Sequence, residues 1–206
     1  MIAIIDYGVG NLYSLSHSLD YIGIENCITR DEAIIRSAEK MILPGVGAFG
    51  DARRKLTETG MDRLVVEKAK NGTPLLGICL GMQLLFQKSY EYGEHEGLKL
   101  LPGEICPLQQ DLPGNLKVPH IGWNELKICR ESPLTLYIRE GDSVYYVHSY
   151  YAKGVGENLV AASEYGVDVP GLVQKGNVFG AQFHPEKNGK VGLAILRAFG
   201  EVKGSC

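Results

Sequence analysis

The sequence predicts an α/β fold with an open, mostly parallel sheet flanked by helices and with antiparallel additions. In the first half, short apolar runs alternate with stretches whose apolar residues recur at helical spacing. That order is typical of parallel strands joined by helices. In the second half, short strand-like runs follow one another closely, which favours antiparallel pairing. We expect one domain over residues 1–206, long enough to bury a substantial core.

The first half begins with an apolar run at residues 2–5, which is predicted to be a buried strand. A helix is expected from about residue 11, because apolar residues recur at helical spacing from Leu12 to Ile22, and Gly23 should end it. Further strands are predicted at residues 24–29, 40–43 and 75–78. Helices are predicted over residues 51–71, with a break at Gly60, and over residues 80–87.

The second half contains shorter elements separated by proline, glycine and polar residues. Strands are predicted at residues 105–109, 125–129, 144–148, 159–162, 172–174 and 178–182, and a final helix at residues 189–199. Open α/β sheets bind ligands at the carboxyl ends of their parallel strands. The loop after Leu43 and the turn at Cys79 are therefore the expected positions of functional groups.

Composition argues against several classes of function. A formal net charge of −3 gives no electrostatic reason to expect nucleic acid or an anionic membrane as partner. No run approaches the roughly 18 apolar residues of a membrane span, and the run before Asp6 is too short for a signal peptide. Five scattered cysteines without C-x-x-C favour a reducing cytoplasm. No metal-ligand spacing is present, so we expect no metal and no cofactor.

The most informative motif is Gly77-Ile78-Cys79-Leu80-Gly81, which follows an apolar run. It is the thiol counterpart of the strand–turn–helix elbow that presents a nucleophile. The helix expected after Cys79 would place unpaired N–H groups beside the sulfur and favour the thiolate. Cysteine is also a common core residue, so the turn alone leaves both interpretations open. The other cysteines are interpreted as structural or incidental: Cys27, Cys106, Cys129 and Cys206.

A cysteine nucleophile needs a base and a group that orients the base. His184 and Glu186 can serve, since residues two apart on an extended segment point the same way. A strand-end histidine beside a surface glutamate is the more ordinary alternative. Oxyanion stabilisation needs N–H donors, which the loop Pro44-Gly45-Val46-Gly47 and Leu80 could supply. By itself, that loop is equally compatible with a simple tight turn.

Taken together, residues 44–47, 77–83 and 184–186 resemble the motifs of the class I (triad) glutamine amidotransferases, whose fold is flavodoxin-like. Further segments resemble the glutaminase subunits of imidazole glycerol phosphate synthases: residues 6–11, 44–49, 119–124, 146–150 and 184–187. The resemblance covers essentially the whole chain. The chain departs from it at Asn188, where the family usually has serine, and we expect little effect on the triad.

The resemblance implies a reaction. Cys79 would attack the side-chain amide of glutamine, His184 would pass its proton to the leaving amine, and Glu186 would orient His184. The implied oxyanion donors are Val46, Gly47 and Leu80, and the implied glutamine contacts are Gly47, Gln83, Glu91, Ser149 and Tyr150. A solvated side chain is an equally good interpretation of Glu91.

The resemblance also implies a partner, because the family passes ammonia to a (β/α)8-barrel cyclase subunit that this chain is too short to contain. The implied interface residues are Asn11, Trp123, Tyr145 and Lys187. Trp123 could instead belong to the core, and Lys187 could be a solvated charge. The competing hypotheses are a paralogous amidotransferase serving another synthase, an inactive scaffold subunit and a stand-alone cysteine hydrolase.

Overall fold

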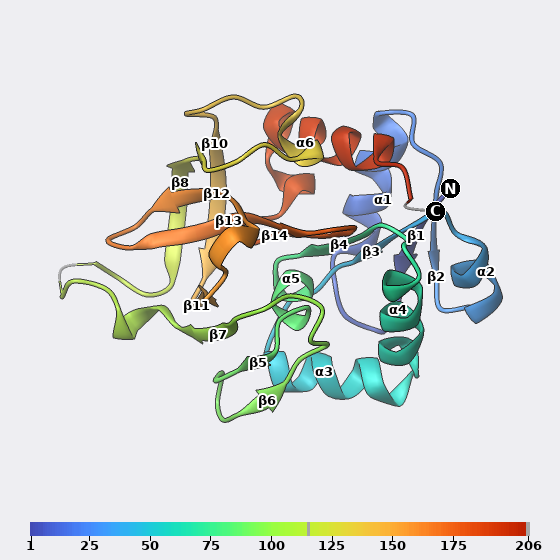
Figure 1. Ribbon diagram of the computed structural model, residues 1–206, viewed down its shortest axis with the longest axis horizontal. Coiled ribbons are helices and arrows are strands. Elements are labelled where there is room, and N and C mark those ends of the chain that lie inside the picture. The colour runs from blue at the N-terminus through green and yellow to red at the C-terminus, as the bar shows by residue number, and fades with distance from the viewer. Residues whose placement is uncertain (115, 205–206) are drawn as a thin grey trace.

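A central eight-stranded sheet runs through the protein in the strand order β2-β1-β3-β4-β14-β13-β12-β9 (Figure 1). The computed structural model describes residues 1–114 and 116–204, so Cys206 lies outside the described residues. Neighbouring strands are parallel from β2 through β1, β3 and β4 to β14. The pairs β14–β13, β13–β12 and β12–β9 are antiparallel. The bounds are β1 Ile2–Ile5, β2 Asn26–Thr29, β3 Lys40–Leu43, β4 Leu75–Ile78, β9 Lys127–Ile128, β12 Leu159–Glu164, β13 Asp168–Lys175 and β14 Val178–Ala181.

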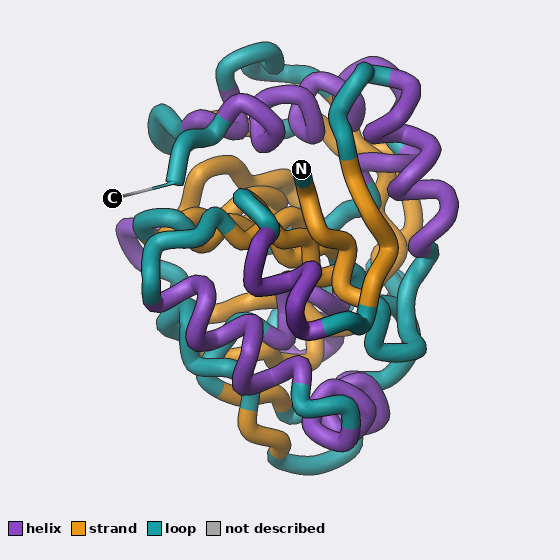
Figure 2. Tube along the Cα trace, turned by 90° about the vertical axis from the view of Figure 1, so that its right-hand side faces the viewer, coloured by secondary structure: helices purple, strands orange, loops and turns teal. Residues whose placement is uncertain are grey.

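Helices cover both faces of this sheet (Figures 1 and 2). On one face lie α1 (Leu12–Tyr21) and α6 (Gly189–Glu201), and on the other α2 (Glu32–Ser37), α3 (Phe49–Glu58), α4 (Met61–Lys70) and α5 (Leu80–Leu84). Successive side chains of a strand point to opposite faces. Ile2 and Ile4 accordingly pack with α1 and α6, whereas Ala3 and Ile5 pack with the other helices. The central strands β1, β4 and β14 are buried along their whole length because each supplies side chains to both cores.

Two smaller sheets flank the central one on the side of β12 and β13. The first pairs β8 (His120–Glu125) with β10 (Ser143–His148), and the second has the order β11-β7-β5-β6. Its strands are β5 Lys88–Ser89, β6 His95–Glu96, β7 Glu104–Pro107 and β11 Tyr150–Lys153. β10 leads into β11 at the edge of the central sheet, so both small sheets lie close to the carboxyl end of β4 (Figure 1).

The predicted mostly parallel sheet between helices is confirmed, and the strands at residues 2–5, 40–43 and 75–78 have the expected bounds. The antiparallel additions are confirmed for β13, β12 and β9, whereas the segment predicted at residues 178–182 forms β14, which pairs in parallel with β4 and antiparallel with β13. The segments predicted at residues 105–109 and 144–148 form β7 and β10, which belong to the separate sheets. Helix α2 was not predicted; it has only 6 residues and begins at a cap in which the Asp31 side chain accepts from the Ala33 and Ile34 N–H groups.

The turn after β4 is built by close packing. Cys79 has φ 53° and ψ −115°, a conformation that costs a non-glycine residue about 1–3 kcal/mol. The two flanking glycines supply space and not unusual torsion angles. A Cβ on Gly81 would lie 1.8 Å from the Leu43 carbonyl oxygen, and one on Gly77 would lie 2.7 Å from backbone atoms of Gly81 and Met82. The start of α5 is therefore pressed against the end of β3.

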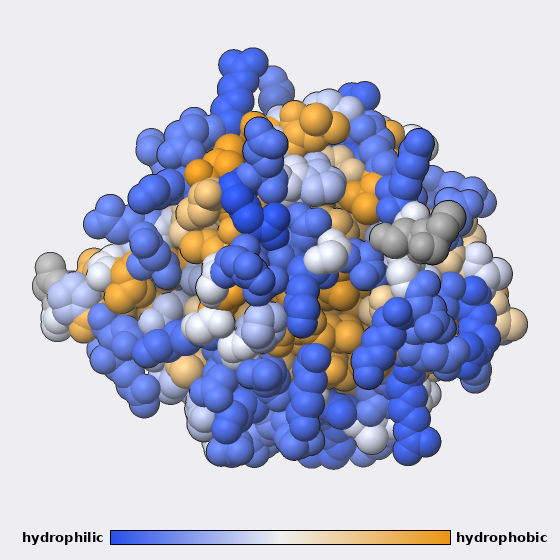
Figure 3. Space-filling view, viewed as in Figure 1, coloured by the Kyte–Doolittle hydropathy of each residue, from blue (hydrophilic) through white to orange (hydrophobic). Residues whose placement is uncertain are grey.

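The surface seen in Figure 3 is largely hydrophilic, with small apolar areas between polar side chains. Within residues 1–114 and 116–204, no helix has the length and apolar character needed to cross a membrane.

We expect Gly81→Ala to lower the free energy of unfolding by about 3 kcal/mol or more, because the new methyl group meets a backbone carbonyl that cannot move without shifting β3. Chemical denaturation of the purified protein measures the effect. Gly114→Ala is the matched control: its Cβ meets nothing within 4 Å, so we expect a change within about 0.5 kcal/mol. Equal stability of the two variants would show that the packing at the turn is loose.

Candidate active site

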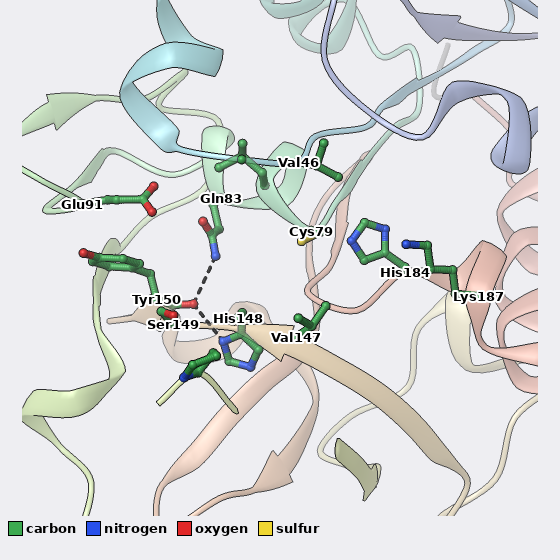
Figure 4. A pocket seen from close by; sticks show the side chains of 13 residues that line it. Val46, Cys79, Gln83, Glu91, Val147, His148, Ser149, Tyr150, His184 and Lys187 are labelled. Atoms are coloured by element: carbon green, nitrogen blue, oxygen red, sulfur yellow. Dashed lines mark hydrogen bonds between the residues drawn. The ribbon is translucent and has the colours of Figure 1, made fainter. Parts of the chain in front are cut away.

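The candidate site is centred on Cys79, at the point where β4 meets α5. The Cys79 N–H donates to the Ala181 carbonyl oxygen at 2.7 Å, which joins the turn to the end of β14. His184 follows three residues after Ala181 and brings its imidazole to the sulfur (Figure 4). Cys79 and His184 are 105 positions apart in the sequence, and they meet because β4 and β14 are neighbours in the sheet.

His184 is held by Glu186, whose Oε1 lies 2.9 Å from His184 Nδ1. Both side chains are buried, at 9% and 3% exposure. The expectation that an extended segment aligns the two is wrong, because Glu186 lies in a short 3-10 helix, η4 (Pro185–Lys187), that begins directly after His184. The tight turn folds the carboxylate back onto the ring, and His184 Nε2 is left to face the sulfur.

The charge state of His184 follows from these contacts. Burial lowers its pKa, but the hydrogen bonds to Cys79 and Glu186 and the negative charge on each outweigh burial and raise the pKa to about 10. An imidazolium therefore lies beside the Cys79 sulfur. Because the folded pKa is above the ordinary value of 6.5, the charged ring stabilises the fold below about pH 6.5, and that contribution is lost as the pH rises through about 10.

A cavity of about 420 Å³ opens in front of Cys79, which is a size typical of small-molecule sites. All the predicted oxyanion and glutamine-contact residues line it together with Cys79 and His184: Val46, Gly47, Leu80, Gln83, Glu91, Ser149 and Tyr150. Lys187, expected at the partner interface, lines it as well. In Figure 4, Gln83, Glu91 and Tyr150 lie on the side of the cavity away from His184. The structure therefore places Cys79, His184 and the predicted oxyanion and glutamine-contact residues around one space, with Glu186 buried behind His184.

The polar residues at the far side of the cavity are already partly paired. Gln83 Nε2 donates to the Tyr150 carbonyl oxygen at 3.1 Å and to Gln182 Oε1 at 3.0 Å. With both amide hydrogens used, Gln83 offers a ligand only its carbonyl oxygen, which suits an ammonium or amide donor. Glu91 Oε2 accepts from the Phe49 N–H at 2.5 Å, and burial raises the pKa of this carboxyl despite that hydrogen bond. Glu91 thus both borders the cavity and holds the first turn of α3.

Two contacts hold the loop at residues 44–47 in place. The Tyr7 hydroxyl donates to the Pro44 carbonyl oxygen at 2.8 Å, and Gly45 packs against the backbone of Gly81. Gly47 has φ +91°, with open space around it, so it needs glycine for its torsion angle and not for packing. The loop therefore passes directly over the elbow with Val46 and Gly47 facing the cavity.

The four residues expected at a partner interface lie at the start of α1, on β8 and β10, and in η4. Trp123 and Tyr145 are paired across β8 and β10, with ring centroids 5.6 Å apart, and Trp123 is 61% exposed, so it is not a core residue. Lys187 lies on the cavity rim beside His184 (Figure 4). Asn11 lies at the start of α1, immediately after Gly10, which approaches Pro44 of the loop at residues 44–47.

Asn188, expected to have little influence on the triad, is in contact with its backbone. Its Nδ2 donates to the His184 carbonyl oxygen at 2.6 Å, and its Oδ1 accepts from the Tyr145 N–H at 2.5 Å. The side chain is buried and joins the histidine turn to β10. Sequence analysis also missed Tyr7, His148 and Gln182. Gln182 lies two residues before His184, just past the end of β14, and that closeness in the sequence was the one available signal.

Comparison with known proteins gives a consistent result. Residues 3–201 match the family described as "Glutamine amidotransferase class-I". "Imidazole glycerol phosphate synthase subunit HisH" of Listeria monocytogenes serovar 1/2a is 50% identical over 206 residues, covering 100% of this chain and 98% of the relative. The protein of the same name from Bacillus licheniformis is 52% identical over 202 residues, covering 97% and 95%.

Solved structures share the fold. A "Crystal structure of glutamine amidotransferase" aligns with a TM-score of 0.75 at 20% identity, covering 97% of each chain. "Structure of PurLQS from Thermotoga maritima" aligns with a TM-score of 0.72 at 21% identity, covering 96% of each chain.

We expect the His184 imidazole to remain protonated until the pH approaches about 10, and its titration midpoint to fall in Cys79→Ala, because the hydrogen bond to Cys79 is the largest contribution that raises the pKa. NMR titration of the histidine ring follows both proteins. Cys106→Ala, which removes a thiol at a distance, is the control and should leave the midpoint unchanged. The same midpoint in Cys79→Ala and wild type would contradict the contact.

Proposed function

Because the chain belongs to the class-I glutamine amidotransferase family, we propose that it hydrolyses glutamine to glutamate and ammonia at Cys79. The observation that carries the proposal is the contact series Cys79–His184–Glu186 at the edge of a cavity of about 420 Å³. A thiol, a charged imidazole and a buried carboxylate in that order are what nucleophilic attack on an amide requires.

The reaction begins when the Cys79 thiolate attacks the side-chain amide carbon of glutamine. A C–S bond forms, and the carbonyl oxygen takes the negative charge. We assign its stabilisation to the N–H groups of Leu80 and of the Val46–Gly47 segment, which line the cavity; each such donor is worth roughly 3–4 kcal/mol of barrier. His184 gives its proton to the amide nitrogen, the C–N bond breaks, and ammonia leaves.

The second half returns the site to its first state. Neutral His184 takes a proton from water, which attacks the thioester carbon, and the C–S bond breaks to release glutamate and the thiolate. Glu186 keeps the His184 Nδ1 proton in place through both steps, so that Nε2 always faces the reacting atoms. Gln83 Oε1 and Glu91 are suited to the glutamine α-ammonium, and the Ser149–Tyr150 segment to its α-carboxylate.

We further propose that the ammonia passes to a (β/α)8-barrel cyclase subunit, which makes imidazole glycerol phosphate and aminoimidazole carboxamide ribotide in histidine biosynthesis. The support is the name of the relatives at about half identity over their full length, which are synthase subunits. An apolar surface also borders the cavity: Ile121, Trp123 and Val147 are 55%, 61% and 45% exposed on β8 and β10. We assign the docking of the cyclase to these neighbouring exposed side chains.

We expect Cys79→Ala to abolish glutamine-dependent synthesis by the complex, with a fall of about 10³-fold or more, while synthesis from added ammonium is retained, because only the nucleophile is removed. Product formation is measured with glutamine and with ammonium as nitrogen source. Cys129→Ala, the same change at an exposed thiol, is the control and should behave as wild type. If glutamine still serves the Cys79→Ala complex, the assigned nucleophile is wrong.

We expect the cyclase with its bound ligand to raise the rate of glutamine hydrolysis at least about tenfold. We also expect Trp123→Ala to raise the Kd for the cyclase about 30-fold, because an aromatic anchor that becomes buried in an interface is worth about 2 kcal/mol. Titration of the hydrolysis rate with cyclase measures both quantities. Leu136→Ala, a change at an apolar residue that is 64% exposed outside β8 and β10, is the control. A rate that does not respond to the cyclase would exclude partner control.

A further inference from the structure

Two histidines outside the triad form a buried pair beneath the exposed face of β8 and β10. His120 on β8 and His148 on β10 are directly opposite in the strand register, and both are almost completely buried. His120 Nδ1 lies 3.0 Å from His148 Nε2, which is hydrogen-bond distance. The reaction described above uses neither ring.

The outer nitrogen of each ring faces an atom that can only accept a hydrogen bond. His148 Nδ1 lies 2.9 Å from the Tyr150 carbonyl oxygen. His120 Nε2 lies 2.7 Å from Asn124 Oδ1, and the orientation of that amide is fixed because Asn124 Nδ2 donates to the Glu164 carbonyl oxygen at 2.9 Å. Both outer nitrogens must therefore carry a proton.

The two inner nitrogens, His120 Nδ1 and His148 Nε2, then lack a proton to share between them. A neutral imidazole has one N–H, so two neutral rings with protonated outer nitrogens would face each other with bare lone pairs at 3.0 Å. A third proton between them turns this repulsion into an N–H···N hydrogen bond. We propose that His120 and His148 hold three protons on their four nitrogens, and that this singly charged pair is a positioning element that fixes the Tyr150 carbonyl beside the cavity.

The surroundings of His120 favour one charge on the pair. Its ring stacks on Tyr146 of β10 at 4.8 Å and on Tyr165, after β12, at 3.9 Å, and a cation gains from aromatic faces at such distances. Tyr146 OH is paired with Ser163 Oγ, and Tyr165 OH donates to the Lys117 carbonyl. In the described part of the chain, neither histidine forms a salt bridge with a carboxylate.

Burial limits the histidine pair to one positive charge. It lowers the pKa of both rings, and with the added charge of His120 it brings the pKa of His148 to about 3. A fourth proton is excluded for this reason. The two outer acceptors, the inner nitrogen and the stacked tyrosines all favour the charged form and oppose this effect of burial.

The pair is connected to the candidate active site through one backbone atom. The Tyr150 carbonyl oxygen accepts from both His148 Nδ1 and Gln83 Nε2 (Figure 4). Gln83 continues to Gln182 Oε1, and Gln182 Nε2 lies 4.0 Å from the Cys79 sulfur. The positioning role in glutamine binding rests on the proposed function, whereas the proton count does not.

The proton count is measured by NMR on the full chain labelled with ¹⁵N-histidine. We expect protons on His120 Nε2 and His148 Nδ1 near neutral pH, and a through-bond ¹⁵N–¹⁵N coupling between His120 Nδ1 and His148 Nε2 that reports the shared third proton. Two protons on the pair, with either outer nitrogen bare, would overturn the proposal.

Variants of Asn124 test whether the acceptor opposite His120 Nε2 is the reason that the pair holds a third proton. In Asn124→Leu, His120 Nε2 no longer faces an acceptor, so its proton can move to Nδ1, and we expect a neutral pair with two protons. Asn124→Asp supplies an anionic acceptor, and we expect the third proton to persist to higher pH than in wild type. A third proton that titrates identically in Asn124→Leu and wild type would contradict the geometric argument.

His148 variants test the positioning role, with glutamine hydrolysis measured in the presence of the cyclase. His148→Leu removes the donor to Tyr150, and we expect the KM for glutamine to rise about tenfold with a smaller change in kcat. His148→Asn places an N–H near the former Nδ1 and should restore much of the KM. Equal KM values in the two variants would overturn the role. If the wild-type protein hydrolyses no glutamine, the proposed function is wrong. The number of protons on the histidine pair is still decided by the NMR measurement alone.

Discussion

The backbone conformation of Cys79 is the constraint on which the rest of the site depends. A cysteine at φ 53° and ψ −115° persists only because the neighbouring packing leaves no alternative. Gly81 lies against the Leu43 carbonyl, Gly77 lies beneath Met82, and the Cys79 N–H is bound to Ala181. This arrangement lifts the sulfur out of the sheet and toward the strand that carries His184. The loop at residues 44–47, for which we propose the oxyanion donors, is packed against Gly81 as well, so the loop and the cysteine turn are positioned together.

The second half of the chain completes the site from the opposite side, and it does so through buried polar contacts. Asn188 connects the His184 carbonyl to the Tyr145 N–H of β10. The histidine pair connects β8 and β10 to the Tyr150 carbonyl, and from there to Gln83. Both connections begin under the exposed apolar face of β8 and β10. A partner bound on that face would therefore act on two separate sides of the cavity.

Much of this architecture could be predicted from sequence because it depends on local patterns. Short apolar runs between turn residues gave the bounds of β1, β3 and β4, and glycine spacing identified the turn at Cys79. The partners Gln182 and His148 could not be identified, since their roles depend on which strands become neighbours. The geometry of His184 and Glu186 was mispredicted because three residues of 3-10 helix carry too little pattern to be distinguished from extended chain. The separation of β8 and β10 from the main sheet depends on long-range pairing in the same way.

The central claim is that Cys79, held in this conformation beside His184, is the one thiol that reacts with a glutamine-shaped ligand. The most direct measurement is to treat the protein with a glutamine analogue that carries a chloroketone in place of the carboxamide, and to map the adduct by peptide mass spectrometry. The account predicts one adduct per chain on Cys79, prevented by excess glutamine, with Cys27, Cys106 and Cys129 unmodified. Labelling of another cysteine, or labelling of Cys79 that glutamine does not slow, would contradict it.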